Sequence, residues 1–388
     1  MMPQRNERPK ILFLFSDTGG GHRSAAEAII EAVNLEFPGQ FETEMVDIFR
    51  HAPPPMQLAI PTYPMFAQMP SIWEIGYTML DGRRRVIVAN SFLTPYMRQY
   101  YQRLIEDHPC DLIVSCHPIP TNGFLDILEE KGDQRTPFIS VVTDMVTTPA
   151  FWYDRRSDKI IVATEYARER GLKMGMREEQ FEVIGLPVAD RFCHPEKDRR
   201  ALRQRLGWPQ DMPIILLVGG GEGMGPLGQN ALAIDRARLP AGVVVVCGRN
   251  WRLRDKLKKH SWSIPAFIYG FVKEMPDFMA AADALVTKAG PGTISEAFIA
   301  GIPLILYSRM PGQEDGNVAY VVEEGAGIWA PQPKLVVEAL REWLCHPEKR
   351  IAAGQAARRL AKPDAARKIA RLLATQLDSN GPSGGKVK

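Results

Sequence analysis

The chain has 388 residues, more than one ordinary hydrophobic core accommodates, so two domains are expected. Its hydrophobic content of 45% and charged content of 24% are those of a folded globular protein. No apolar run reaches the roughly 18–20 residues of a transmembrane helix, and the formal net charge of +3 is too small to indicate a nucleic-acid partner.

Short apolar segments bounded by turn residues alternate with helical segments along the first half of the chain. This alternation is typical of a parallel sheet covered by helices on both faces. A helix is predicted over residues 25–33, directly after the first strand. The strands of this half are predicted over residues 11–15, 41–49, 112–116, 137–143, 159–163 and 181–184.

The same alternation restarts after a polar, proline-containing stretch around residues 186–200, where we place the domain boundary. A helix is predicted over residues 231–238. The strands of this half are predicted over residues 213–218, 243–247, 267–269, 284–287 and 303–306. The predicted fold class is therefore α/β, with two Rossmann-like, doubly wound parallel-sheet domains facing a cleft and a ligand at the carboxyl ends of the strands.

The predicted boundaries follow from these elements. They are residues 1–190 for the N-terminal domain, 191–362 for the C-terminal domain, 363–377 for a C-terminal helix and 378–388 for a disordered tail.

One stretch, residues 53–101, breaks the alternation. It holds five of the sixteen methionines, several aromatic side chains and a run of arginines. Methionine and aromatic side chains adapt to irregular apolar partners, and neighbouring arginines suit phosphate head groups. Two interpretations stay open: a membrane-touching or lipid-accepting insertion, and a helical subdomain that packs on the sheet. The side chains that favour the first are Met65, Trp73, Met79, Arg83, Arg84 and Arg85.

A glycine-rich loop, residues 16–24, joins the first predicted strand to the first helix. Gly20 and Gly21 let backbone N–H groups approach a ligand, and the helix N-terminus adds partial positive charge. The loop lacks the ending of a phosphate-binding NTPase loop, and Ser24 stands where a dinucleotide fingerprint has its third glycine. Asp47, at the end of the second strand, keeps a dehydrogenase open as an alternative.

His22 lies in this loop, next to the start of the helix. The positive end of a helix disfavours an imidazolium ion, so a neutral ring would be available as a base near pH 7. The alternative is a histidine that only caps the helix or bonds a neighbouring carbonyl.

A second glycine loop follows the strand predicted over residues 213–218. Five glycines in seven residues exceed the need of one tight turn, which favours close approach to a phosphate. The strand after it ends in Gly248-Arg249 and not in a ribose-binding acid, which weakens an NAD-binding interpretation. The loop residues singled out here are Gly220, Gly221, Glu222 and Gly223.

A third region, residues 287–296, ends a strand and opens a helix. Backbone amides, the hydroxyl of Thr293 and the helix dipole converge on one anion site. Glu296 could accept both hydroxyls of a ribose. Gln313 and Glu314, in the loop after the next strand, suit the hydroxyls of a sugar, or else belong to a solvated turn.

These motifs, in this order and spacing, resemble the monogalactosyldiacylglycerol synthases. That family consists of inverting glycosyltransferases of GT-B fold, and it is related to the processive diacylglycerol glucosyltransferases. The resemblance covers residues 11 to 329. It rests on residues 19–23, 219–226, 247–250, 270–272, 287–293, 311–314, 316–318 and 320–323.

The resemblance implies that the C-terminal domain binds a UDP-sugar without a metal or other cofactor. Backbone groups of Phe271 and Val272 would read the uracil edge, and Glu296 would hold the ribose. Gln313 and Glu314 would hold the hexose. The diphosphate would lie against Gly220, Gly221, Glu222, Gly223, Gly290, Pro291, Gly292 and Thr293. Arg249 and Lys288 are further candidates for binding the donor. No D-x-D sequence lies between the domains to hold a divalent ion.

The resemblance also implies that the N-terminal domain binds diacylglycerol. His22 matches the proposed general base of the family, and Asp144, at the end of another strand, would orient it or act as the base itself. Residues 53–98 match the membrane-association and acceptor region, with anionic lipids as partners. UDP-galactose is the expected donor, and UDP-glucose stays open.

The expected location is the inner leaflet of the cell membrane, as a peripheral protein of the cytoplasm. The five cysteines are scattered and form no C-x-x-C pair, which indicates reduced thiols. Only about ten residues precede the first strand, with no secretory signal or plastid transit peptide among them. A non-catalytic binding protein of this fold would be expected to lack His22 or Glu296, and both are present.

Overall fold

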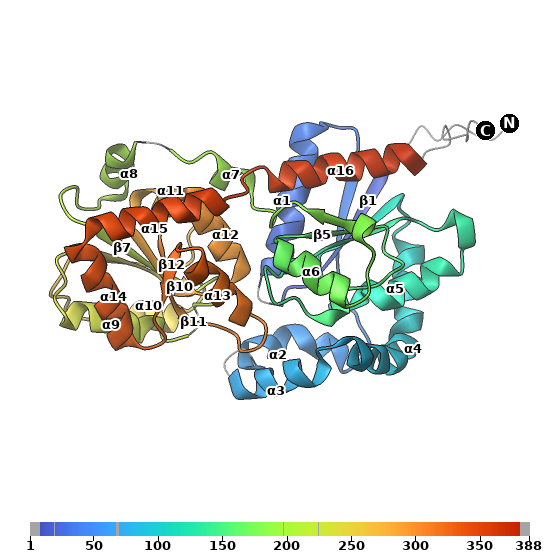
Figure 1. Ribbon diagram of the computed structural model, residues 1–388, viewed down its shortest axis with the longest axis horizontal. Helices are drawn as coiled ribbons and strands as arrows, with labels where there is room; N and C mark the ends of the chain where they lie inside the picture. Colours follow the sequence, from blue (N-terminus) through green and yellow to red (C-terminus); the bar gives the residue numbers. More distant parts are fainter. Residues whose placement is uncertain (1–7, 19, 67–69, 197, 224, 381–388) are drawn as a thin grey trace. The chain divides into compact units, whose positions relative to one another are not determined.

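The computed structural model describes residues 8–18, 20–66, 70–196, 198–223 and 225–380 of the chain. The chain divides into two compact units. The first comprises residues 1–63, 74–190 and 364–388, and the second comprises residues 64–73 and 191–363. The path of the chain thus leaves the first unit after Asp190 and returns to it at Asp364 (Figure 1).

The first unit is built on a six-stranded parallel sheet in the order β2-β1-β3-β4-β5-β6. Its strands are short and apolar, and most of their residues are buried because helices cover both faces. They are β1 (Lys10–Phe15), β2 (Glu42–Asp47), β3 (Leu112–Ser115), β4 (Phe138–Val141), β5 (Lys159–Val162) and β6 (Phe181–Val183).

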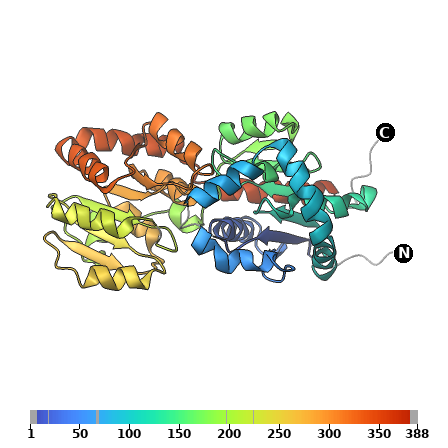
Figure 2. The ribbon, with the colours of Figure 1, turned by 90° about the horizontal axis from the view of Figure 1, so that it is seen from below.

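Each face of this sheet has its own core. On one face, α1 (Gly21–Glu36) packs its alanine and isoleucine residues against β1 and β3. On the other face, α4 (Arg83–Asp107) and α5 (Pro120–Glu129) enclose Phe124 and Tyr101. A further helix of this unit, α6 (Glu165–Lys173), packs against β5 and β6 (Figure 2).

The C-terminal helix, α16 (Ala365–Asn380), belongs to the first unit. Its apolar stripe, with Ile369, Ala370 and Leu373, joins the core formed by α1 and β1. Arg367 and Arg371 both pair with Glu36, at the end of α1. Residues 378–380 continue this helix, so the prediction that the disordered tail starts at 378 is wrong; residues 381–388 lie outside the described residues.

Most of the described residues in the stretch 53–101 are helical. After a short 3-10 turn (Met56–Leu58) they form α2 (Ala59–Phe66), α3 (Pro70–Leu80) and most of α4. Met97, Tyr101 and Leu104 bury the inner face of α4 against the sheet core. Several large apolar side chains of α3 and α4 remain exposed: Ile75, Met79, Leu80, Ile87, Val88, Phe92 and Tyr96. The segment is therefore both a packed helical subdomain and a carrier of exposed apolar surface.

The second unit has a six-stranded parallel sheet in the order β12-β11-β10-β7-β8-β9. Its core lies between β7, β8 and the helices that cover them. The strands are β7 (Ile214–Val218), β8 (Gly242–Val246), β9 (Ala266–Tyr269), β10 (Ala284–Lys288), β11 (Leu304–Ser308) and β12 (Gly327–Trp329). The helices are α8 (Arg199–Leu206), α9 (Leu227–Arg236), α10 (Trp251–Lys258), α11 (Met275–Ala281), α12 (Pro291–Ala300), α13 (Asp315–Glu323), α14 (Pro333–Cys345) and α15 (Pro347–Leu360). A short helix, α7 (Asp190–Cys193), stands at the boundary of the units.

The strand orders fix where a ligand can bind in each unit. In an open parallel sheet the binding crevice lies at the carboxyl ends of the strands, where the direction of winding reverses. That point lies between β1 and β3 in the first unit and between β7 and β10 in the second. Among the described residues, no helix is both long and apolar enough to cross a membrane.

Candidate functional site

His22 lies at the reversal point of the first sheet, as the second residue of α1. Its Nδ1 is 2.8 Å from the carbonyl oxygen of Cys116, which follows β3, and 2.8 Å from Oγ1 of Thr143, which follows β4. A carbonyl oxygen only accepts hydrogen bonds, so Nδ1 carries the proton and Nε2 keeps its lone pair. The ring is thereby held in the tautomer that a general base needs.

The surroundings of His22 keep the ring neutral. Burial lowers its pKa from the ordinary 6.5 to about 4, and the bond to Cys116 opposes this only partly. The ring of His117 lies 4.5 Å away, and that of Trp152 lies 6.3 Å away. His117 is itself buried, and burial lowers its pKa well below 6.5. Two neutral imidazoles therefore lie side by side at this position.

Asp144 lies next to Thr143 and is buried. Its Oδ2 accepts a hydrogen bond of 2.7 Å from Nε1 of Trp152. Thr143, His117 and Trp152 were missed in the sequence analysis. A signal existed for the first two, because each is the second residue after a buried strand that ends at the site.

The loop before α1 leaves open space in front of His22. Gly20 has a left-handed backbone, with φ of 77°, and no atom lies within 4 Å of where a Cβ of Gly20 or Gly21 would stand. Gly19 lies outside the described residues. Asp17 and Arg23 pair with each other across the loop. The loop therefore permits close approach of a substrate to the start of the helix.

Asp47 has a structural role in this unit. Its Oδ1 accepts from the backbone N–H of Phe49 at 3.0 Å, and its Oδ2 accepts from that of Asp17 at 3.4 Å. Both oxygens are thus engaged by the backbone of the loops that follow β1 and β2.

Lys288 lies at the reversal point of the second sheet, at the end of β10. The pairing of β10 with β11 shifts register between Thr287 and Lys288. A Cβ at Gly220 would stand 3.4 Å from Lys288 Cε, and one at Gly290 would stand 3.3 Å from Lys288 Nζ. The ammonium group therefore lies between the glycine loop after β7 and the start of α12.

Glu314 holds Lys288 in this position. Its Oε1 is 3.2 Å from Lys288 Nζ, and its Oε2 accepts a 2.8 Å hydrogen bond from the backbone N–H of Met310. The Glu314 side chain is only 6% exposed. Both oxygens of Glu314 thus have partners within the protein, whereas the family resemblance predicts that this side chain holds a hexose. Gln313, its neighbour, is partly exposed in the same loop.

Residues 219–223 of the second glycine loop pack against the turn after β8. A Cβ at Gly223 would stand 2.0 Å from the carbonyl oxygen of Cys247, and Gly223 has a φ of 59°. Gly221 has neither constraint, since its Cβ would meet only Arg249, at 3.8 Å. Arg249 pairs with Glu222 at 2.6 Å. Some glycines in this loop are therefore required by packing, and others leave room for a ligand.

The start of α12 adds backbone donors beside Lys288. Gly290 is its N-cap and Pro291 its first residue. No atom lies within 4 Å of where a Cβ of Gly292 would stand, and Thr293 is partly exposed. In the second turn, burial raises the pKa of the Glu296 carboxyl to about 8.

Phe271 and Val272 lie in the loop that follows β9 at the edge of the sheet. Phe271 is 60% exposed, and the guanidinium of Arg249 lies 5.3 Å from the centre of its ring. This loop is also at the carboxyl end of the sheet, where Lys288 and the glycine loop lie.

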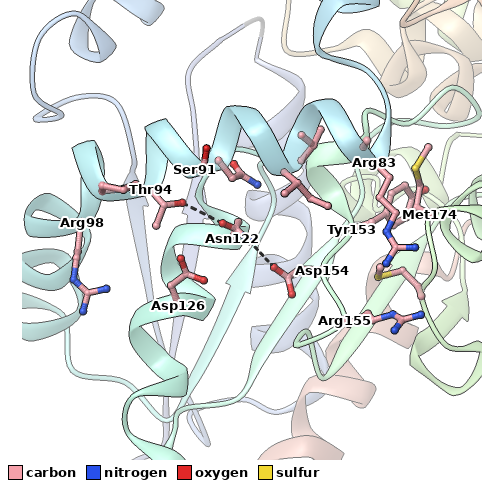
Figure 3. A pocket seen from close by; sticks show the side chains of 16 residues that line it. Arg83, Ser91, Thr94, Arg98, Asn122, Asp126, Tyr153, Asp154, Arg155 and Met174 are labelled. Atoms are coloured by element: carbon pink, nitrogen blue, oxygen red, sulfur yellow. Dashed lines mark hydrogen bonds between the residues drawn. The ribbon is translucent and has the colours of Figure 1, made fainter.

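A cavity of about 470 Å³ opens beside α4 in the first unit (Figure 3). Apolar side chains such as Val86, Tyr153 and Met174 line part of it. Arg83 and Arg155 line the same cavity, and both guanidinium groups lie within 3.3 Å of where a Cβ of Gly175 would stand. The cavity thus combines an apolar wall with two neighbouring cations.

The other residues predicted for acceptor or membrane contact are distributed along α2 to α4. Met79, Arg84 and Arg85 are exposed, and Arg85 donates to the carbonyl oxygen of Thr78. Trp73 is partly buried. The side chain of Met65 lies outside the description. No group of three or more His, Cys, Asp or Glu side chains that could hold a metal ion occurs in the described ranges.

Comparison with known proteins identifies the family. Residues 22–188 match the family model of monogalactosyldiacylglycerol (MGDG) synthase, and residues 214–369 match that of the glycosyltransferase family 28 C-terminal domain. The probable chloroplastic monogalactosyldiacylglycerol synthase of Glycine max is 37% identical over 377 residues, which are 94% of this chain and 71% of that protein. This chain belongs to the monogalactosyldiacylglycerol synthase family.

Solved structures agree on the fold. A putative UDP-N-acetylglucosamine 2-epimerase from Listeria monocytogenes superposes with a TM-score of 0.63 at 15% identity, covering 97% of this chain and 98% of that one. MurG from Acinetobacter baumannii gives 0.62 at 13% identity, covering 95% and 100%. At such identities the similarity shows the fold alone, and it confirms the predicted α/β, GT-B architecture.

Membership of the monogalactosyldiacylglycerol synthase family makes the chain a glycosyltransferase. This confirms the predicted enzyme class and overturns the dehydrogenase alternative. It also overturns the alternative of a non-catalytic binding protein.

Proposed function

We propose that the chain transfers galactose from UDP-galactose to the free hydroxyl of 1,2-diacylglycerol, with inversion, and so forms a β-galactosyl-diacylglycerol. Family membership supports the reaction class. The observation that carries the proposal is the state of His22, a neutral imidazole whose Nδ1–H is engaged by a carbonyl oxygen. Such a ring has one free lone pair and accepts one proton.

In this reaction His22 Nε2 takes the proton of the glycerol hydroxyl while that oxygen attacks the anomeric carbon. The bond from that carbon to the diphosphate oxygen breaks on the opposite face, and UDP leaves. One base and one displacement invert the configuration at the anomeric carbon. When the ring becomes an imidazolium, Thr143 and the Cys116 carbonyl continue to accept from Nδ1–H and hold its orientation.

The second unit would bind the donor. Lys288 and the N-terminus of α12 would face the diphosphate, because both carry positive charge at the carboxyl end of the sheet. Glu296 would hold the ribose, the backbone at Phe271 and Val272 would contact the uracil, and Gln313 would contact the hexose. This arrangement neutralises the leaving group with protein groups, and we propose no metal ion or other cofactor for it.

The first unit would also contact the membrane. The exposed apolar side chains of α3 and α4 lie on the same helices as Met79 and the arginine run at 83–85. In the cavity beside α4, Arg83 and Arg155 would bind the phosphate of an anionic lipid head group. We therefore propose a peripheral protein that works at a lipid surface.

Incubation of the purified protein with diacylglycerol vesicles and labelled UDP-galactose or UDP-glucose tests the proposal. Galactose should enter the lipid fraction at a higher kcat/KM than glucose. Faster labelling from UDP-glucose would assign the chain to diacylglycerol glucosyltransferases, since the two donors differ in one epimeric hydroxyl. Labelling of lipid from neither donor would overturn the proposal.

A further inference from the structure

Asp81 forms the turn between α3 and α4 and contacts two other parts of the first unit. Its Oδ2 is 2.5 Å from Nη2 of Arg170, on α6, and its Oδ1 accepts a hydrogen bond of 3.3 Å from the backbone N–H of Ala150. The Asp81 and Arg170 side chains are 22% and 25% exposed, so the pair is screened less than a surface ion pair.

Arg170 extends this contact along the loop that follows β4. Its Nε donates to the carbonyl oxygen of Thr148 at 2.5 Å. Asp81 and Arg170 together therefore hold the backbone at residues 148 and 150. The loop is held at a third point by the Tyr153 hydroxyl, which lies 2.8 Å from the carbonyl oxygen of Ala167.

Trp152 lies in this loop, and its side chain packs near His22. Its side chain is fully buried, its Nε1 donates to Asp144, and its ring centre lies 6.3 Å from that of His22. Together with His117 it packs beside the His22 ring, which is itself only partly exposed. Any movement of residues 148–153 away from α6 would therefore expose more of the imidazole to water.

We propose that Asp81 is a positioning residue for His22: it ties the turn between α3 and α4 to the loop of residues 148–153 and so keeps Trp152 packed beside the imidazole. The contact also connects the helices that carry the exposed apolar side chains with the loop that covers His22. The link to lipid binding rests on the proposed function; the positioning of Trp152 does not.

The titration of His22 separates this role from a merely structural ion pair. The titratable residues next to the ring are Cys116 and His117 after β3. Asp144, after β4, bonds Trp152, and Asp17 and Arg23 pair with each other. Replacing Asp81 leaves all of them in place. Loss of a negative charge alone would lower the pKa of His22, whereas entry of water would raise it towards 6.5. The sign of the change therefore identifies the cause.

The experiment is an NMR titration of the full chain from pH 8 to pH 5 with histidine rings labelled, and His22→Gln identifies the signal. In the wild type the His22 signal should stay at its neutral position down to pH 5, because its pKa is about 4. In Asp81→Ala the pKa should rise by about one pH unit or more, with titration visible between pH 6.5 and 5. Asp81→Glu, which retains the carboxylate, should behave as the wild type.

Glu130→Ala is the matched control, since it removes another ion pair of α4, the 2.6 Å contact of Arg98 with Glu130, and leaves the loop untouched. It should leave the His22 titration unchanged. An unchanged or lowered pKa in Asp81→Ala would overturn the proposal, as would an equal rise in Glu130→Ala. If Asp81→Ala does not fold, Asp81→Asn replaces it with the same expected sign. The titration needs no substrate, so its result is independent of the transfer assay.

Discussion

The two sheets have the same topology at their carboxyl ends, but the central side chains there differ in charge. In the first unit the central side chain is His22, which burial and a carbonyl partner keep neutral. In the second unit it is Lys288, which pairs with a buried carboxylate and is held in place by it. A base must be uncharged before it takes a proton, and a group that receives a diphosphate must be cationic. In the proposed function, this difference in partners, carbonyl against carboxylate, separates the two tasks.

The largest effect is expected from replacing His22, the central side chain of the first unit. His22→Gln keeps a donor near the Cys116 carbonyl but removes the base, so turnover should fall by about 10²–10⁴-fold. Steady-state transfer measurements give kcat, and calorimetric titration with UDP should give an unchanged Kd. Retained turnover would place the base elsewhere, and Asp144→Asn would then test its neighbour.

The next prediction concerns Lys288, the central side chain of the second unit. Lys288→Met keeps the aliphatic stem and removes the charge. The affinity for UDP should fall by about 10–100-fold, the expected effect of losing charge-assisted hydrogen bonds of about 1.5–3 kcal/mol. Lys334→Met, at an 83% exposed lysine, serves as the control in the same calorimetric titration. Equal UDP affinity in all three proteins would contradict the assigned role of Lys288.

A smaller effect is expected from the groups that orient His22. Thr143→Val keeps the shape of the side chain and removes the hydroxyl that contacts Nδ1. Because the Cys116 carbonyl remains, kcat should fall by no more than about tenfold.

The pH dependence of turnover in the wild-type protein is a separate test of His22. The profile of kcat against pH should stay flat from pH 8 to 5 and fall only near pH 4, where His22 becomes protonated. A profile that falls near pH 6.5 would contradict the neutral, buried state of the ring.

The smallest effect concerns the exposed apolar side chains. Phe92→Ser, at a side chain that is 75% exposed, should weaken sedimentation with lipid vesicles by about three- to tenfold, because partial insertion of one aromatic ring contributes about 1 kcal/mol. Ile351→Ser on α15, 53% exposed, is the control. Equal binding of the two variants to vesicles would contradict membrane contact by α4 and indicate a purely structural role for this helix.

Much of the fold and part of the site can be predicted from the sequence, because the determinants are local. Apolar strands, glycine loops and helix starts follow one another within a few residues, so β1, β7 and the loops after them lie where the pattern indicates. The positions of His22 and Lys288 at strand ends follow from the same reasoning.

The remaining contacts join residues far apart in the chain. Thr143 meets His22 across 121 positions, and Arg367 meets Glu36 across 331, so no local pattern indicates either pair. Glu314 shows a different difficulty: its residue type suits a sugar hydroxyl, but its partners in the fold are Lys288 and the Met310 backbone. A buried carboxylate reveals its role only when the neighbouring cation is known.

The configuration of the sugar in the product tests the central claim most directly, namely that one neutral base acts in a single displacement. UDP-galactose is an α-glycoside, and the NMR spectrum of the purified galactolipid reports the anomeric configuration. We predict the β-anomer. The α-anomer would contradict the account, because retention requires a second displacement or a nucleophile that His22, held as it is, does not provide.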